Sequence, residues 1–152
     1  FNDPHYYPPP GSVHKILSGE ESLSAGASLT RILYEEPKQT MYYLINKLYY
    51  DATDTSVLSH EIKIDSSKAL NDPNYHLFKE GVDWASPKEP FIIYPMIPAK
   101  DSIEWKVGNG GTSTNTVKVF VHVFEVRKDD YEEWLDSLPE KHKTRAGYLK
   151  LV

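Results

Sequence analysis

The clearest pattern of hydrophobic and polar positions lies between Phe91 and Val126, where turn residues separate three strand-like runs. Within residues 117–126, valine occupies positions 117, 119, 121 and 123, while phenylalanine or valine occupies 120, 124 and 126. Alternate side chains of a strand point to opposite faces, so both faces of this run are apolar. The pattern predicts a strand buried on both sides, or one lying between a core and a partner.

The two runs before it carry simpler signals. From 102 to 107 the chain alternates strictly, and we expect Ile103, Trp105 and Val107 to face inward. Residues 108–114 are rich in Gly and Asn, which tolerate the positive φ of hairpin loops. In the run 91–97, Pro95 predicts an edge strand or a bulge, because proline donates no backbone hydrogen bond.

Four upstream runs also predict strands, at residues 13–18, 28–34, 41–50 and 57–65. The polar residues 19–24 predict a turn. Both faces of the 41–50 run are apolar, so periodicity alone also permits a buried helix. Its aromatic and β-branched residues, and the turn residues beside it, favour a strand. The 57–65 run has an apolar face and a polar face, which is typical of an antiparallel sheet with one buried side.

About seven strands separated by turns predict a mainly β protein, namely an antiparallel β-sandwich of jelly-roll type. We expect the sandwich to span residues 13–128. Residues 1–12 are proline-rich, which favours an extended arm in the polyproline II conformation, although a frayed terminus is the alternative. The polar stretch 66–90 is long, and loops of this length are usually functional or contain short elements of their own.

The period changes in the last segment, residues 129–152, which predicts a helix followed by a tail. Tyr131, Trp134, Leu135 and Leu138 follow the spacing of an amphipathic helix over residues 129–138. Asp129 with Glu132 resembles a capping box at its start, and Pro139 ends it. The apolar face of this helix is expected to cover either the sandwich or a partner subunit.

Composition narrows the function classes. The chain has 152 residues and a formal net charge of −5, which fits one domain and argues against a broad contact with nucleic acid. It has no apolar run as long as the ~20 residues of a membrane helix, and the absence of Cys excludes disulfides and thiolate catalysis. The chain begins at Phe1 rather than Met, so we expect a processed product or a piece whose leader lies outside it.

Motifs for chemistry are missing from the sequence. We find no phosphate-binding loop, zinc-protease helix or serine nucleophile elbow. The six His residues are scattered, and a cupin-like metal site would need His60, His122 and a carboxylate to converge inside the sandwich. A histidine on an apolar strand face, as at His60, is more often a core residue than a ligand. We therefore predict a protein that is not an enzyme, with no catalytic residue, metal site or cofactor.

Two stretches, residues 22–50 and 91–126, carry a resemblance to a known class. The first begins Ser-Leu-Ser-Ala-Gly-Ala-Ser-Leu-Thr and continues into a long aromatic strand. The second combines the turn Pro-Ala-Lys-Asp-Ser at 98–102 with the hairpin Gly-Gly-Thr-Ser-Thr-Asn at 110–115 before a final strand. Both resemble small β-sandwich proteins of phage and virus particles. The resemblance implies a structural, decoration or attachment role in the virion, and it transfers no site residues.

The sequence thus predicts a structural or decoration component of a phage or virus particle that self-associates into a homo-oligomer and contacts other virion or capsid proteins. The arm residues Tyr6, Tyr7, Pro8, Pro9 and Pro10 are the expected contacts with a neighbouring subunit. The alternative is a receptor- or carbohydrate-binding module, extracellular or at a cell surface. In that case the stacking platform would consist of four aromatic residues: Tyr6, Tyr7, Trp84 and Tyr94.

Overall fold

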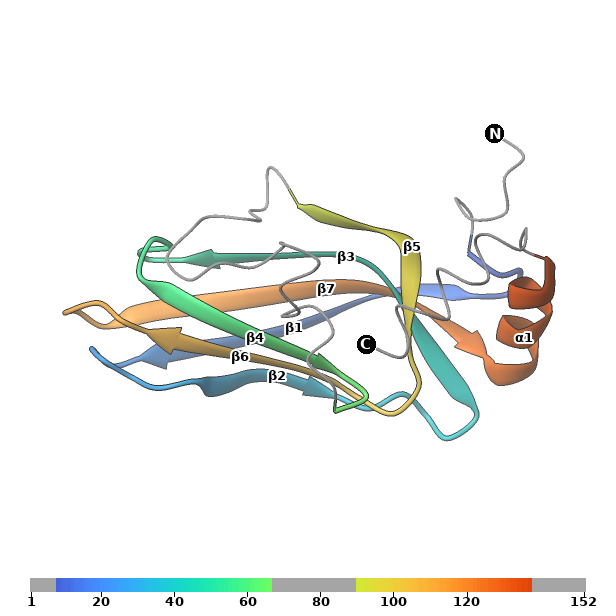
Figure 1. The fold of residues 1–152 in the computed structure, drawn as a ribbon, viewed down its shortest axis with the longest axis horizontal. Helices are drawn as coiled ribbons and strands as arrows, with labels where there is room; N and C mark the ends of the chain where they lie inside the picture. Colours follow the sequence, from blue (N-terminus) through green and yellow to red (C-terminus); the bar gives the residue numbers. More distant parts are fainter. Residues whose placement is uncertain (1–7, 67–89, 138–152) are drawn as a thin grey trace.

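The computed structural model describes residues 8–66 and 90–137, which form two antiparallel sheets packed face to face, with a short helix at one end (Figure 1). The strand order is β1-β7-β3-β5 in the four-stranded sheet and β2-β6-β4 in the three-stranded sheet. The predicted mainly β class, the antiparallel pairing and the short C-terminal helix are confirmed. The elements are β1 (Val13–Leu23), β2 (Thr30–Glu35), β3 (Met41–Ala52), β4 (Leu58–Ile64), β5 (Phe91–Ala99), β6 (Ile103–Asn109), β7 (Asn115–Arg127) and α1 (Lys128–Ser137).

A β-bulge explains why both faces of β3 look apolar in the sequence. The register of β3 shifts between Ile45 and Lys47 against both of its neighbours, β5 and β7. An extra residue reverses the alternation of side chains. Tyr43 and Ile45 before the bulge, and Leu48 and Tyr50 after it, are therefore all buried in the core. Strict alternation placed these two pairs on opposite faces, and that prediction is wrong.

The central strand β7 is apolar on both faces for two different reasons. Its valines at 117, 119, 121 and 123 are buried in the core between the sheets. On its other face, Val126 joins Leu44 of β3 beneath α1, where Tyr131 and Trp134 pack against them. The ring of Tyr131 also meets Tyr42 edge to face at 5.4 Å. The apolar face of α1 therefore covers the outer face of the four-stranded sheet at one end, rather than being left for a partner.

The polar turn predicted at residues 19–24 is wrong, because β1 continues to Leu23. In this stretch Glu20 lies opposite Lys118 and Ser22 opposite Thr116 of β7. Leu23 itself is buried in the core. An edge strand with one polar face has the same composition as a turn, and only its pairing with β7 distinguishes the two.

Gly19 is required where β1 passes close to β2. A Cβ atom at this position would overlap the backbone carbonyl of Ile32, which cannot move aside as a flexible side chain would. We expect Gly19→Ala to lower the free energy of unfolding by about 1–3 kcal/mol through this overlap. Urea unfolding measures this loss. The control is Ser18→Ala, on the exposed side of the same strand, which should lower the free energy of unfolding by less than about 0.5 kcal/mol. A wild-type midpoint for Gly19→Ala would contradict the close approach of the two strands.

Candidate functional site

The outer face of the four-stranded sheet carries a continuous group of aromatic and apolar side chains beside the helix. In the pairing of β1 with β7, His14 lies opposite Phe124 and Ile16 lies opposite His122. In the pairing of β3 with β7, Tyr49 lies opposite Phe120. Ile16 is 53% exposed, which is unusual for so apolar a side chain. We call this group the aromatic strip and define it by its members: His14, Ile16, Tyr49, Phe120, His122 and Phe124.

His122 lies at the centre of the aromatic strip and uses both ring nitrogens. Its Nδ1 lies 3.0 Å from Nε2 of His14, and its Nε2 lies 3.0 Å from the hydroxyl of Tyr49. The His14 ring packs on Phe124, with centroids 5.3 Å apart, and the Tyr49 ring stacks on Phe120 at 4.9 Å. This chain of hydrogen bonds and ring contacts joins β1, β7 and β3 across the sheet.

Burial also sets the charge of His122. The residue is 7% exposed, and desolvation lowers the pKa of its imidazole, with smaller effects in the same direction from Lys47 and His14. The ordinary pKa of histidine is about 6.5, so His122 is predominantly neutral at pH 7. The strip therefore presents a largely uncharged surface at its centre.

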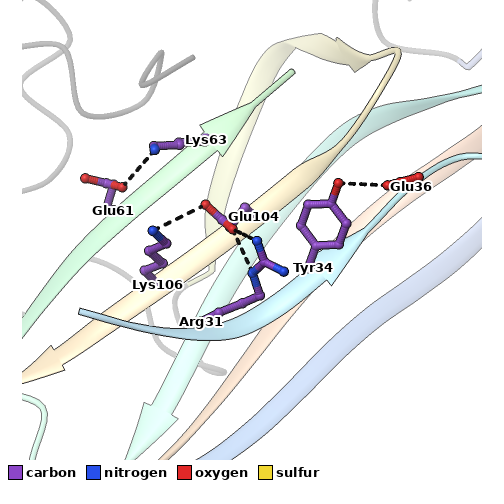
Figure 2. A network of polar contacts seen from close by, with 7 residues as sticks. All are labelled: Arg31, Tyr34, Glu36, Glu61, Lys63, Glu104 and Lys106. Atoms are coloured by element: carbon purple, nitrogen blue, oxygen red, sulfur yellow. Dashed lines mark hydrogen bonds and ion pairs between the residues drawn. The ribbon is translucent and has the colours of Figure 1, made fainter. Parts of the chain in front are cut away.

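The outer face of the three-stranded sheet is different, because charged side chains of both signs cover it (Figure 2). Glu104 of β6 lies between two cations: Arg31 Nε donates to its Oε2 at 2.7 Å, and Lys106 Nζ lies 3.8 Å from its Oε1. On β4, Lys63 Nζ lies 3.6 Å from Glu61 Oε1. Such a face is polar, although Glu104 itself is buried. Among the described residues, the more apolar of the two outer faces is that of the four-stranded sheet, which makes it the better candidate for a contact surface.

His60 of β4 points into the core, as the sequence predicted. Trp105 Nε1 donates a hydrogen bond to His60 Nδ1 at 3.1 Å, and the ring centroid of Tyr50 lies 4.4 Å away. Burial lowers the pKa of His60 to about 4. His122 lies on the outer face of the other sheet, so these two histidines do not converge as a cupin-like metal site would require. Among residues 8–66 and 90–137, no group of three or more His, Cys, Asp or Glu side chains could hold a metal ion.

A concave surface lies at one end of the sandwich, where two buried asparagines hold the loops. Asn109 Nδ2 donates to the carbonyls of Leu23, Ser24 and Ser113, and Asn115 Nδ2 donates to the carbonyl of Asp54. These bonds fix the β3–β4 and β6–β7 loops beside each other. The depression between the loops is lined by Thr53, Asp54, Val57 and residues 110–115.

The structure tests few of the predicted site residues. Tyr6, Tyr7 and Trp84 lie outside the described residues, and Tyr94 lies in the edge strand β5. Pro8 is half-buried, Pro9 is buried and Pro10 is exposed. The predicted docking of these residues on a neighbour stays a prediction.

The described end of the predicted arm forms a turn. Ser12 N–H donates to the Pro9 carbonyl at 3.2 Å, and Gly11 has a φ of +82°. Proline followed by glycine at positive φ is typical of a type II turn, and Pro10-Gly11 occupy those two positions. An extended conformation is therefore not confirmed for residues 8–12.

The sequence interpretation missed the aromatic strip as a site. The outward positions 120, 122 and 124 of β7 carry a visible signal, and the pattern predicts either a strand buried on both sides or one between a core and a partner, without naming the neighbouring residues of β1 and β3. His14 and His122 are separated by 108 positions in sequence. Only the register of β1 against β7 brings them together, and the local sequence does not specify this register.

Comparison with known proteins does not assign this chain to a family. A scan against protein-family models finds no match for this chain, and a search of curated proteins also finds none. Within the part of the chain that the structure describes, no helix is long and apolar enough to cross a membrane.

Proposed function

We propose that this chain is a structural or decoration component of a phage or virus particle, located in the virion, and that it acts by self-association through the aromatic strip. The observation that carries the proposal is the contrast between the two outer faces. One face carries charged pairs such as Arg31 with Glu104, while the other presents Ile16 at 53% exposure among aromatic rings. A one-sided apolar face of this kind marks a contact surface.

The strand order supports a jelly roll within this proposal. A jelly roll contains eight strands in two sheets and is common in viral capsid and lectin domains. The orders β1-β7-β3-β5 and β2-β6-β4 follow that arrangement, with one edge position beside β4 not filled by a described strand. Because one fold serves many functions, this order supports the class of protein and does not by itself select a particle.

A second copy of the same chain is the partner that best fits the strip. Charges of both signs lie at one end of it: Lys118 of β7 lies between Glu20 of β1 and Asp51 of β3, with its Nζ 4.0 Å from Glu20 Oε1. A two-fold axis through such a surface can place each sign opposite the other, as an isologous contact requires. A stable contact would bury about 1,200–2,000 Å² in total, which face-to-face packing of two such sheets can supply.

The test is the solution mass of the full chain, measured by light scattering over a range of concentrations. We expect wild type to be a defined oligomer and Ile16→Lys to be monomeric, because the new ammonium would lose its water at the contact. The matched control is Leu29→Lys, since Leu29 is 43% exposed and lies outside the strip, and this variant should keep the wild-type mass. A monomeric wild type at every concentration would refute self-association.

The location in a particle needs a separate experiment. Particles purified from the source of the chain should contain it at a fixed ratio to the major structural protein, as measured by quantitative mass spectrometry. Washing the particles in high salt distinguishes a bound component from an adhering contaminant. Absence from washed particles would refute the virion role and leave self-association as a separate finding.

A receptor- or carbohydrate-binding module is the second candidate, favoured by the depression at the end of the sandwich. Thr53, Thr112 and Thr114 line it together with Gly110 and Gly111, and threonine hydroxyls and backbone amides are donors and acceptors suited to sugar hydroxyls. A glycan array on the full chain tests this function. Binding should disappear in Thr112→Tyr, which fills the depression, while the solution mass stays unchanged. If wild type binds no glycan, carbohydrate is excluded as the ligand of this second candidate function.

A further inference from the structure

Two imidazole nitrogens on neighbouring strands point at one another on the outer face of the four-stranded sheet. His14 Nε2 and His122 Nδ1 are 3.0 Å apart, and the two rings are tilted by 39° with centroids 5.1 Å apart. We propose that His14 Nε2 and His122 Nδ1 form a two-histidine site for a divalent transition-metal ion such as Cu²⁺, Ni²⁺ or Zn²⁺. Binding of the ion breaks the hydrogen bond between the two nitrogens, and the proton that joined them moves by way of water to the other nitrogen of the same ring, so both imidazoles stay neutral.

The distance fits two ligands of one ion. Metal–nitrogen bonds are about 2.0–2.1 Å long, so two nitrogens at right angles around an ion lie about 3.0 Å apart, and two in a tetrahedral arrangement about 3.3 Å. The observed 3.0 Å equals the separation of neighbouring ligands of square-planar or octahedral ions, the geometries that Cu²⁺ and Ni²⁺ prefer. Because the two nitrogens face each other in a hydrogen bond, the exposed His14 ring must turn until both lone pairs converge on an ion beside the line that joins them. Zn²⁺ requires the rings to separate by a few tenths of an ångström, which rotation of the exposed His14 side chain allows.

Tyr49 supplies the outer contact that a ligating histidine needs. Metal-bound imidazoles usually donate their second N–H to an oxygen, which fixes the tautomer and the ring orientation. With an ion on Nδ1, His122 carries its proton on Nε2 and donates it to the Tyr49 hydroxyl oxygen 3.0 Å away. The stacking of Tyr49 on Phe120 holds that hydroxyl in place. Tyr49 is thus a positioning residue for this site.

Two features set the affinity that we expect of this site for the metal ion. Only the neutral form of an imidazole has a nitrogen lone pair free for the ion, so binding should weaken as the pH is lowered. Lys47, which acts on His122 electrostatically, opposes a second positive charge. No group of three His, Cys, Asp or Glu residues forms in the described chain, so water fills the other coordination positions. We therefore expect micromolar affinity, well below that of three- and four-ligand sites.

The test is isothermal titration calorimetry of the full chain with NiCl₂, and then with CuCl₂ and ZnCl₂. Wild type should show one site that weakens by tenfold or more in His14→Gln and His122→Gln. Tyr49→Phe keeps the stacked ring and removes the oxygen, so it should weaken binding about tenfold. Lys47→Met should bind at least as tightly as wild type. His60→Gln controls for a histidine in the other sheet, where His60 contacts Trp105, and should leave the site unchanged.

Unchanged affinity in His14→Gln would overturn the proposal, because the ion would then sit on other histidines. Thermal unfolding without metal verifies that each variant folds, and saturating Ni²⁺ should raise the Tm of wild type more than that of His14→Gln. Wild type alone provides a second readout, since paramagnetic Cu²⁺ should broaden the NMR signals of Phe124 before those of Trp105. The site needs one copy of the chain, so the affinity for the ion should not depend on the concentration of the chain. The solution mass should depend on it, and this difference separates the test of the metal site from that of self-association.

Discussion

Acidification from pH 7 to pH 4 is expected to remove about 3 kcal/mol from the free energy of unfolding through His60 alone. The pKa of His60 is lowered to about 4 by burial, whereas the unfolded chain titrates near the ordinary value of about 6.5. Between these two values the unfolded state binds the proton and the folded state does not. The contribution is therefore complete above pH 6.5, is lost as the pH falls toward 4, and stays constant below.

Urea unfolding at a series of pH values measures this loss, with His60→Gln as the matched variant. The glutamine amide oxygen can still accept the hydrogen bond that Trp105 Nε1 donates to His60 Nδ1 at 3.1 Å, but the side chain does not titrate. Carboxylates titrate in both proteins, so their effects cancel in the difference between wild type and variant. That difference should change by about 3 kcal/mol between pH 7 and pH 4. Parallel pH profiles would show that His60 is protonated in the folded chain, which contradicts its burial.

The environment of His60 could be predicted because β4 and β6 obey simple alternation. Ile103, Trp105 and Val107 were expected to face inward, and all three are buried in the core. Each of these strands has one polar face, so a period of two assigns every side chain without knowledge of its neighbours. For such strands, the local sequence carries enough information to position a core histidine.

The same argument fails where the chain departs from regular alternation or where both faces are apolar. The bulge between Ile45 and Lys47 leaves no signature in residue types, yet it reverses every side chain that follows. Similarly, the outward residues of β7 are apolar over a stretch that α1 covers and over a stretch that it leaves open. The aromatic strip depends on pairing between β1 and β7, which are far apart in the sequence. Its members could be named from the sequence, but their convergence could not.

Truncation of Trp134 is expected to produce the other large effect, a loss of about 3–5 kcal/mol from the free energy of unfolding. The indole packs with Tyr131 on Leu44 and Val126, in a hydrophobic cluster separate from the main core. Trp134→Ala leaves a cavity that the rigid sheet beneath cannot fill. For a chain of this size the loss corresponds to a Tm lower by roughly 10 °C. Calorimetry measures it, and Glu133→Ala on the exposed side of α1 should change stability by less than about 0.5 kcal/mol.

The same substitution links the helix to self-association. Because α1 covers the end of the outer face next to Phe124, loosening it exposes Leu44 and Val126 and lengthens the apolar surface. Trp134→Ala should therefore form larger or tighter oligomers than wild type in light scattering, while Ile16→Lys in the same background should reduce them. The helix then limits how much of the sheet a second copy can contact. A Trp134→Ala variant that keeps wild-type stability would instead show that α1 contributes little to the fold and does not limit the contact.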